Sequence, residues 1–461
     1  MSSKLIIIVF LLSFVLLTDL YIVPIDSARQ QYDKKSNEPT MVDPTLKAEV
    51  VFKGTNFLTS MAFLGPDDIL VLEKNTGKVE RILDGQVQDT LLDANVATDY
   101  ERGMIGIAIA KNYNGNENRN NLSSVYVFLF YTESNQDSND DCPYPNYCRD
   151  VGSPAVNRLY RYELLNNRLV NPKLILNLSS TPMPVHIGGA ILIGPENHVY
   201  LITGDGSFGN TTLADQRILY TKSSNAPNGS EPIGRGGILR ITQDGKYVEK
   251  GILGNTYPLN LYYAYGIRSS FGMDFDPVTG NLWDTENGPV YGDEINLVKP
   301  GFNSGWNKVQ GIWKNNVYTN GETVSNPDNL ADFGGKGIYS SPEFTWYKPS
   351  VGPTALKFLN SDKIGKQYEN DMFVGDYHTG YLYHFDLNEN RTELVLHGPL
   401  KDKVADTLIE LQDVIFGQGF GRITDIDVGP DGYLYILSNY DTSNDYKEGR
   451  SVIHRMVPVK D

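Results

Sequence analysis

Short apolar runs separated by turns rich in Gly, Asp and Pro recur along the chain. The repeated unit is an apolar run, a turn containing Gly-Pro or Asp-Pro, and a second run rich in Tyr, Leu and Val. Such runs, bounded by turn residues, are typical of β-strands joined as hairpins. The six copies are MAFLGPDDILVLE (61–73), the looser pair of runs in 105–133, AILIGPENHVYLITGD (190–205), GMDFDPVTGNLWDTEN (272–287), the looser DMFVGDYHTGYLYHFDL (371–387) and DIDVGPDGYLYILSN (425–439).

Each copy predicts a hairpin with one apolar face. A single hairpin cannot bury that face, but six hairpins arranged radially can. A β-sandwich would also contain many short strands, but it would not explain one turn formula recurring six times. We therefore predict an all-β fold, a six-bladed β-propeller of four-stranded antiparallel blades over residues 46–461. Polar insertions at 134–153, 206–236 and 312–340 are expected to shape one rim of it.

The N-terminus is the exception to this pattern. Lys4 precedes the apolar run LIIIVFLLSFVLL (5–17), which has the order of an export signal. Residues 1–27 are predicted to be either a cleaved signal peptide or a retained membrane anchor, and 28–45 a polar linker. Either alternative places the body of the protein outside the cytoplasm, with membrane association through the N-terminal segment if it is retained.

Two cysteines agree with an oxidising compartment. Cys142 and Cys148 lie close together in CPYPNYC, without a neighbouring histidine that would favour zinc. We expect them to form a disulfide that closes a loop. Five Asn-x-Ser/Thr sequons are weaker support for export, because they arise by chance in Asn-rich chains: Asn121, Asn177, Asn210, Asn228 and Asn390.

The charge balance excludes one class of partner. The chain has 56 Asp and Glu residues against 40 Lys and Arg residues, a formal net charge of −16. Nucleic-acid binding needs a basic stripe, and the sequence has none. An acidic surface is compatible with cation binding, although it is most often simply well solvated.

Among the six histidines, His186 has the most informative position. It stands in PVHIGGAILIGP, just before a predicted strand, and the partner strand ends in the TGD sequence at 203–205. A hairpin brings those two ends together, so Asp205 is expected to orient His186. An imidazole held in this way can act as a general base near neutral pH.

Two further segments carry candidate chemistry. Arg268, in AYGIRSSFGMDF, precedes a strand at the same predicted end of the fold. The segment TENGPVYGDEINLVKPGFNSGW (285–306) joins an irregular Gly-Pro turn to the acids Asp293 and Glu294. Turn carbonyls and carboxylates are hard oxygen ligands of the kind that calcium takes, although the spacing is not that of an EF-hand.

Together these motifs resemble the soluble quinoprotein glucose/sorbosone dehydrogenase family. The resemblance covers about residues 48–458 and rests on YERGMIGIAIA, HIGGAILIGP with YLITGDG, the block 264–306 and GRITDIDVGPDGYLYIL. It implies a six-bladed propeller that uses pyrroloquinoline quinone (PQQ) and Ca²⁺ to oxidise the C1 hydroxyl of an aldose sugar to the lactone. The electrons would pass to an acceptor that the sequence does not identify.

The resemblance also implies roles for individual residues. His186 matches the base that takes the hydroxyl proton, Asp205 its supporting acid, and Arg268 the cation beside the reactive quinone carbonyl. The other implied roles are cofactor contact for Glu101 and Arg422, calcium binding on the cofactor for the carbonyls of Gly288 and Pro289, and a second, structural calcium site for Asp293 and Glu294.

Three positions depart from the glucose-oxidising members. His378 replaces a lysine that contacts PQQ, Thr424 replaces an arginine, and Ser269 replaces an asparagine. Because PQQ carries three carboxylates and each charge-assisted bond contributes about 1.5–3 kcal/mol, the departures affect the expected cofactor affinity. The departures at His378 and Thr424 favour one alternative, a non-catalytic propeller that binds a carbohydrate or protein at the cell surface. A calcium-dependent lactonase-type propeller, in which a channel metal activates water, is a separate alternative.

Overall fold

The structure is a computed structural model. The predicted signal or anchor at 1–27 and the cysteine pair Cys142–Cys148 lie outside the residues it describes, so the predictions made for them stay predictions. The only helices in the described ranges are short 3-10 turns, and none of them has the length and apolar character needed to cross a bilayer. The described residues are 38–54, 56–98, 100–113, 122–134, 155–179, 184–206, 221–226, 228–248, 250–314, 323, 327–348, 350–441 and 449–459.

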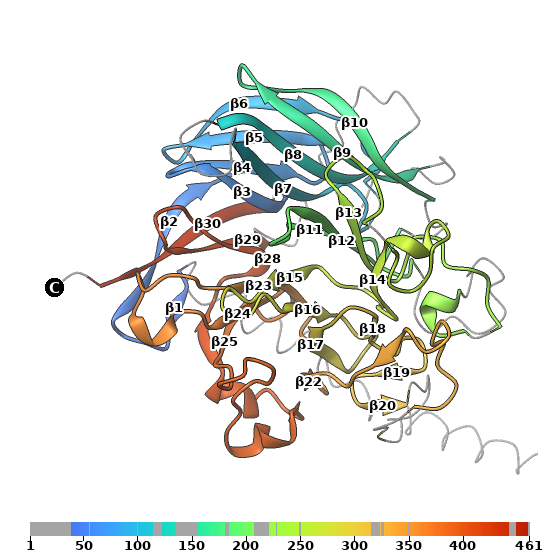
Figure 1. The fold of residues 1–461 in the computed structure, drawn as a ribbon. Helices are drawn as coiled ribbons and strands as arrows, with labels where there is room; N and C mark the ends of the chain where they lie inside the picture. The colour runs from blue at the N-terminus through green and yellow to red at the C-terminus, as the bar shows by residue number, and fades with distance from the viewer. Residues whose placement is uncertain are drawn as a thin grey trace, which may run out of the picture. The chain divides into compact units, whose positions relative to one another are not determined.

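Strands dominate the described residues (Figure 1). Three of the sheets have four antiparallel strands each. Their orders are β3(Leu58–Gly65)-β4(Asp68–Glu73)-β5(Lys78–Leu83)-β6(Gln86–Asp93), β10(Arg168–Ser179)-β9(Val156–Leu165)-β8(Leu122–Glu133)-β7(Met104–Tyr113), and β2(Leu46–Lys53)-β30(Gly449–Pro458)-β29(Leu434–Asp441)-β28(Arg422–Val428).

Three further sheets have six, five and five strands. Their orders are β11(Gly188–Ile193)-β12(His198–Thr203)-β13(Gly237–Thr242)-β14(Tyr262–Tyr265)-β18(Phe302–Asn303)-β21(Ile338–Tyr339), β15(Gly272–Phe275)-β16(Leu282–Glu286)-β17(Asp293–Val298)-β22(Phe344–Trp346)-β26(Val404–Ala405), and β23(Pro353–Phe358)-β24(Met372–Asp376)-β25(Tyr381–Phe385)-β27(Ile415–Gln418)-β1(Thr40–Met41). The remaining elements are the ribbon β19(Val309–Gln310)-β20(Trp313–Lys314) and the 3-10 turns η1(Lys222–Ser224), η2(Leu259–Leu261), η3(Lys366–Tyr368), η4(Gly398–Asp402) and η5(Glu410–Asp413).

We predicted that every blade would have four antiparallel strands. This prediction is wrong, because the sheets differ in the number of strands and some contain parallel pairs. The short strands β18, β21 and β26 pair in parallel with their neighbours and extend two of the sheets. They come from long excursions between the regular strands, which reach back to the sheet edge and satisfy its free backbone groups. β1 extends a third sheet by pairing with β27, although it lies inside the segment predicted to be a polar linker.

The predicted propeller is confirmed by how the sheets meet. Their first strands contact one another in the order β3, β7, β11, β15, β23, β28 and back to β3. This closed succession of inner strands is the radial packing of an all-β propeller. Five of the predicted hairpins are the first and second strands of their sheets. The sixth, at 371–387, is instead the second and third strands, β24 and β25, because β23 precedes them.

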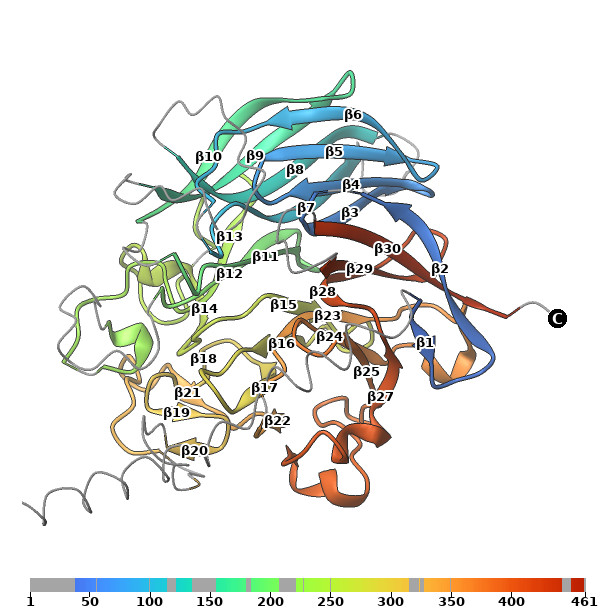
Figure 2. The ribbon, with the colours of Figure 1, turned by 180° about the vertical axis from the view of Figure 1, so that it is seen from behind.

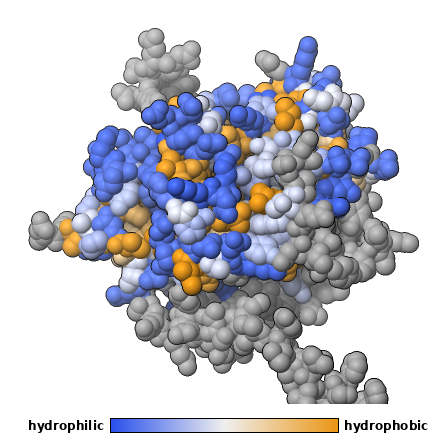
Figure 3. Space-filling view, turned by 90° about the horizontal axis from the view of Figure 1, so that it is seen from below, coloured by the Kyte–Doolittle hydropathy of each residue, from blue (hydrophilic) through white to orange (hydrophobic). Residues whose placement is uncertain are grey.

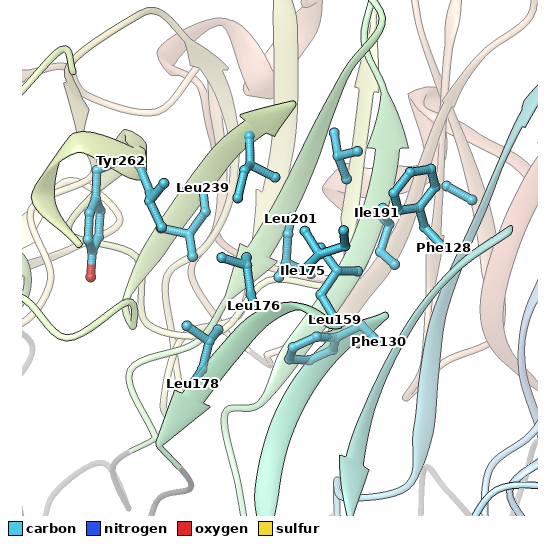
Figure 4. Packing of buried hydrophobic residues seen from close by; sticks show 14 of the residues in the cluster. Phe128, Phe130, Leu159, Ile175, Leu176, Leu178, Ile191, Leu201, Leu239 and Tyr262 are labelled. Atoms are coloured by element: carbon cyan, nitrogen blue, oxygen red, sulfur yellow. The ribbon is translucent and has the colours of Figure 1, made fainter. Parts of the chain in front are cut away.

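Apolar side chains fill the space between neighbouring sheets. Phe128 and Phe130 of β8 are fully buried in one cluster with Leu201 of β12 and Leu239 of β13 (Figure 4). Because alternate residues of a strand point to the same face, Phe128 and Phe130 contribute to one cluster. Burying each of these side chains contributes about 1.5–3 kcal/mol. On the face shown in Figure 3, hydrophilic residues predominate and apolar ones are scattered among them.

One sheet joins distant parts of the sequence. β2 pairs with β30 in antiparallel register, with Leu46 opposite Pro458. Both ribbon views show the two strands side by side (Figures 1 and 2). β2 thus supplies the outer strand of the sheet that contains β28, β29 and β30.

Candidate active site

His186 and Asp205 meet at one end of the β11–β12 hairpin. His186 lies two residues before β11, Asp205 two residues after β12, and Gly188 pairs with Thr203 between them. His186 Nδ1 is 2.8 Å from Asp205 Oδ1, and both side chains are more than nine-tenths buried. The predicted contact is confirmed.

A tight backbone approach fixes the position of His186. The residue has a φ of 53°, in the left-handed region, and Gly188 follows with a φ of 71°. A Cβ on Gly204 would stand 2.1 Å from the carbonyl oxygen of His186, so no larger residue fits there. The two glycine positions let the segments pass close enough for the imidazole to reach Asp205.

Asp205 is anchored from two other segments. Its Oδ2 accepts a hydrogen bond of 2.6 Å from Trp306 Nε1, and its backbone N–H donates to the carbonyl of Arg268. Because an ionised carboxylate only accepts, His186 must donate through Nδ1–H, which leaves Nε2 as the acceptor of the neutral ring. Trp306 was not among the predicted site residues, since 101 positions separate it from Asp205.

Arg268 lies directly beside this pair. Its Nη1 donates to the carbonyls of Asn287 (2.8 Å) and Gly288 (3.2 Å), and its guanidinium carbon is 5.4 Å from the centre of the Trp306 ring. Burial lowers the pKa of Arg268, although nearby acids, Asp205 first among them, oppose the effect. The buried Nε has no hydrogen-bond partner within the described residues. A desolvated cation with an unused donor is suited to binding an anionic or oxyanion group.

Glu101 and Ser269 contact backbone groups close to His186 and Arg268. Glu101 Oε2 accepts from the N–H of Ile187 at 3.0 Å, next to His186. The carbonyl of Ser269 accepts from the N–H of Asn287 at 2.7 Å, and its side chain is buried. The structure thus brings both predicted cofactor positions to the His186–Arg268 region.

His378 and Arg422 lie further around the same end of the fold. His378 Nδ1 is 3.0 Å from the carbonyl of Ser350, and the guanidinium carbon of Arg422 lies 5.1 Å from the centre of the Tyr377 ring. The backbone N–H of His378 donates to the carbonyl of Val351. The loop around Val351 therefore connects His378 with the site through Asp293, and Arg422 joins it through Tyr377, whose N–H donates to the carbonyl of Gly352.

Asp293 is a backbone anchor in this structure. One oxygen accepts from the N–H of Gly288 at 2.7 Å, and the other from the N–H groups of Val351 (2.7 Å) and Gly352 (2.9 Å). The Ser350 hydroxyl donates to the same carboxylate. These donors hold the Gly288-Pro289 turn against the next sheet, so Asp293 positions the predicted calcium-binding carbonyls.

Glu294 points to the opposite face of β17, as strand alternation requires. There it lies with Asp284 and Glu286, and the Ser304 hydroxyl is hydrogen-bonded to both glutamates. Burial raises the pKa of Asp284 to about 7, of Glu294 to about 8, and of Glu286 well above its usual value. Neither oxygen of Asp284 has a hydrogen-bond partner in the described ranges.

This buried set is rich in acceptors. The side-chain oxygens of Asn296 and Gln310 also lack hydrogen-bond partners among the described residues. Carboxylate and amide oxygens in one place are the ligands that Ca²⁺ takes. Asp284 and Glu286 were missed from the sequence, although the D-x-E of β16 lies opposite the E-x-N of β17 in the pairing Glu286–Glu294 and Asp284–Asn296.

Thr424 lies two residues after Arg422 on β28 and contacts the neighbouring inner strand, β3. Its hydroxyl donates to the carbonyl of Leu58 at 3.2 Å. It borders a cavity of about 950 Å³ lined by all six first strands, together with Pro195, which follows the far end of β11. The cavity therefore opens at the end of the inner strands opposite to His186.

The family model for glucose/sorbosone dehydrogenases matches residues 56–447. The chain belongs to this family. An uncharacterized protein of Synechocystis is 24% identical over 426 residues, 88% of this chain and 89% of the relative. The quinoprotein glucose dehydrogenase B of Acinetobacter calcoaceticus is 27% identical over 331 residues, 68% of this chain and 64% of the relative.

Solved structures share the fold. The PQQ-bound aldose sugar dehydrogenase of Streptomyces coelicolor matches with a TM-score of 0.59 and 19% identity, covering 91% of this chain and 99% of the other. At this identity the likeness shows the architecture alone, in agreement with the propeller described above.

Proposed function

We propose that this protein is a PQQ- and calcium-dependent dehydrogenase that oxidises the C1 hydroxyl of an aldose to the lactone. The observation that carries the proposal is the buried His186–Asp205 pair beside Arg268, whose Nε is unused. Membership of the family and the names of its relatives, a quinoprotein glucose dehydrogenase and aldose sugar dehydrogenases, support the same reaction class.

The donors present at this end of the fold fit PQQ. Its three carboxylates need cations and N–H donors, and Arg268, Arg422 and His378 lie around one end of the inner strands. We assign the cofactor to these three residues together with Glu101, His186 and Ser269. Thr424 is the weakest member of the predicted set, because its hydroxyl already donates to Leu58. When bound, PQQ supplies the two-electron acceptor that a propeller lacks.

His186 acts as the general base in this proposal. Its Nδ1–H donates to Asp205, so Nε2 takes the proton of the sugar hydroxyl. Asp205 then stabilises the imidazolium that forms, and Trp306 holds Asp205 in place. The exclusion of water around these buried groups strengthens each of these interactions.

Calcium is assigned to two places. The carbonyls of Gly288 and Pro289 would hold one ion at the cofactor, with Asp293 fixing the turn. Glu294 would hold a second, structural ion with Asp284 and Glu286, whose uncompensated carboxylates require a cation or protons.

The remaining predictions extend this proposal. Each of the six larger sheets is taken as one blade. The body of the protein works outside the cytoplasm, reached by a cleaved signal or held by a retained anchor at 1–27, and Cys142 and Cys148 form a disulfide. Electrons pass to an acceptor that is still to be identified.

A reconstitution experiment tests the proposal. The purified protein is treated with a chelator and titrated with PQQ, with and without Ca²⁺, while the cofactor absorbance is followed. A panel of aldoses is then assayed by dye reduction. We expect saturable, calcium-dependent PQQ binding and sugar-dependent reduction; no spectral change together with no activity on any sugar would overturn the proposal.

A further inference from the structure

Three potential metal ligands converge at the β24–β25 hairpin. Asp371 immediately precedes β24, His384 is the penultimate residue of β25, and Asp386 follows that strand. One ligand atom from each side chain lies within 4.8 Å of the other two. We call these three residues the hairpin cluster. It was not singled out from the sequence, because His384 occupies an ordinary strand position.

The distances in the hairpin cluster suit a shared ion. His384 Nε2 is 2.9 Å from Asp371 Oδ2 and 3.6 Å from Asp386 Oδ1. Two ligands bound to one tetrahedral ion at about 2.0–2.1 Å stand roughly 3.3–3.4 Å apart. A small adjustment of the side chains therefore converts the observed contacts into ligation.

Three aromatic rings pack around His384 and restrict its motion. Its ring lies 5.2 Å from the ring of Tyr368, 5.1 Å from Phe373 and 5.7 Å from Phe416, centre to centre. The side chain of Asp371 is nearly buried, whereas that of Asp386 is 57% exposed. Two ligands are thus preorganised, and the third is accessible to solvent.

The electrostatics also favour a cation. Burial raises the pKa of Asp386, His384 lowers it, and the neighbouring carboxylate of Asp371 raises it again. His397, on the segment after β25, lowers the pKa of Asp386 as well. Two carboxylates facing one imidazole carry an excess of negative charge, which a divalent ion neutralises better than a single protonated histidine.

The hairpin cluster is separate from the candidate active site. β24 runs from Met372 to Asp376, and His378 follows its other end. At about 3.3 Å per residue, the strand places the cluster on the order of 15 Å or more from His378. Asp371, His384 and Asp386 have no part in the function proposed above.

We propose that Asp371, His384 and Asp386 bind one divalent first-row transition-metal ion. One imidazole with two carboxylates is a mixed nitrogen and oxygen set of the kind that takes Zn²⁺ or its neighbours. A water molecule completes the coordination. The ion fastens the end of β25 to the start of β24 and so steadies the excursion that begins at Asp386.

Titration with Zn²⁺ tests this proposal. The chelator-treated full chain is kept in excess Ca²⁺, so that oxygen-only sites are filled, and titrated calorimetrically. We expect one Zn²⁺ per chain. Co²⁺ in place of Zn²⁺ is expected to give the visible absorption bands of a four-coordinate site. The Asp386→Asn variant should bind at least tenfold more weakly, whereas the exposed and nearby Asp413→Asn should bind as the parent does.

Two further measurements decide the outcome. Zn²⁺ should shift the imidazole nitrogen resonances of His384, and His384→Gln, checked for native circular dichroism, should abolish the high-affinity event. Absence of any Zn²⁺ binding in excess Ca²⁺ would overturn the proposal, as would equal affinity in Asp386→Asn and the parent. Loss of fold in His384→Gln leaves the Asp386→Asn comparison to decide.

Discussion

The two ends of the inner strands contain buried charges that are arranged in different ways. At the His186 end, charged side chains are held by backbone groups: Asp293 by the N–H groups of Gly288 and Val351, and Arg268 by two carbonyls. At the cavity end, charges pair with each other. Lys357 Nζ lies 3.0 Å from Asp427 and 3.5 Å from Asp274.

The His186 end therefore has charged groups that are oriented for binding, whereas the charges at the cavity end mainly stabilise the fold. Backbone contacts orient Arg268 without neutralising it and leave its Nε unused. At the cavity end, Lys357 already pairs with two aspartates, so a ligand there would have to compete with existing ion pairs. A large cavity is thus a weaker indication of chemistry than a small group of oriented, unsatisfied donors.

The largest expected effect is on the His186 end. His186→Gln removes the proton acceptor while keeping a polar side chain of similar reach. We expect kcat for aldose oxidation to fall by roughly 10³–10⁴-fold, with PQQ binding largely kept. Dye-reduction kinetics measure the effect, and the exposed His397→Gln serves as control. Activity within tenfold of the parent would remove His186 from the role of base.

At the cavity end, removing a charged side chain is expected to lower the stability of the fold. Lys357→Met leaves the buried Asp274 and the partly exposed Asp427 without their cation, and we expect a loss of about 3 kcal/mol in the free energy of unfolding. Denaturant titration measures it. The double variant Lys357→Met with Asp427→Asn should regain part of the loss. A single variant as stable as the parent would contradict the ion-pair interpretation.

A pH dependence sharpens the comparison further. Burial raises the pKa of Asp425 to about 8, so the folded state holds a proton that the unfolded state releases near pH 4. Stability contributed by this proton is therefore lost as pH rises from about 4 to 8. Asp425→Asn should lack this loss. Between pH 5 and pH 8, we expect the free energy of unfolding of Asp425→Asn to rise relative to the parent by only about 2 kcal/mol, because Asp425 borders the cavity and is partly solvated. Thermal or denaturant unfolding measures the difference. An equal pH slope in both proteins would refute it.

The smallest expected effect concerns Trp306. Trp306→Phe removes the indole N–H that donates to Asp205 but keeps an aromatic ring near Arg268. We expect kcat to fall about tenfold and the pH profile of kcat to shift, because Asp205 is held less firmly. Aldose KM should change little. A loss in KM alone would mean that Trp306 contacts the sugar and does not position Asp205.

The site was predictable from the sequence where local pairing determines it. His186 and Asp205 stand at the two ends of one hairpin, so the strand pattern alone predicts their contact. Trp306 lies three residues after β18, an outer strand of only two residues, which leaves no periodic pattern in the sequence. The same reason hides β21 and β26, and with them the unequal sizes of the sheets.

Asp293 and Glu294, which face opposite sides of β17, show a second limit to prediction from the sequence. Adjacent acids in a sequence suggest a shared ligand set, yet neighbours on a strand face opposite sides of the sheet. Asp293 therefore meets backbone N–H groups, and Glu294 meets Asp284 and Glu286 across the strand pair. Once β16 and β17 are recognised as paired strands, the residues opposite one another across the pair predict the ligand set better than residues adjacent in the sequence.

The pairing of β2 with β30 also bears on how the protein is made. During synthesis, β2 emerges early, while its partner is added only after almost all of the remaining chain. Until then β2 has an unpaired strand edge, and such edges promote association between chains. We expect the nascent chain to depend on chaperones over this interval, and the completed sheet to form late, as its very non-local contacts require.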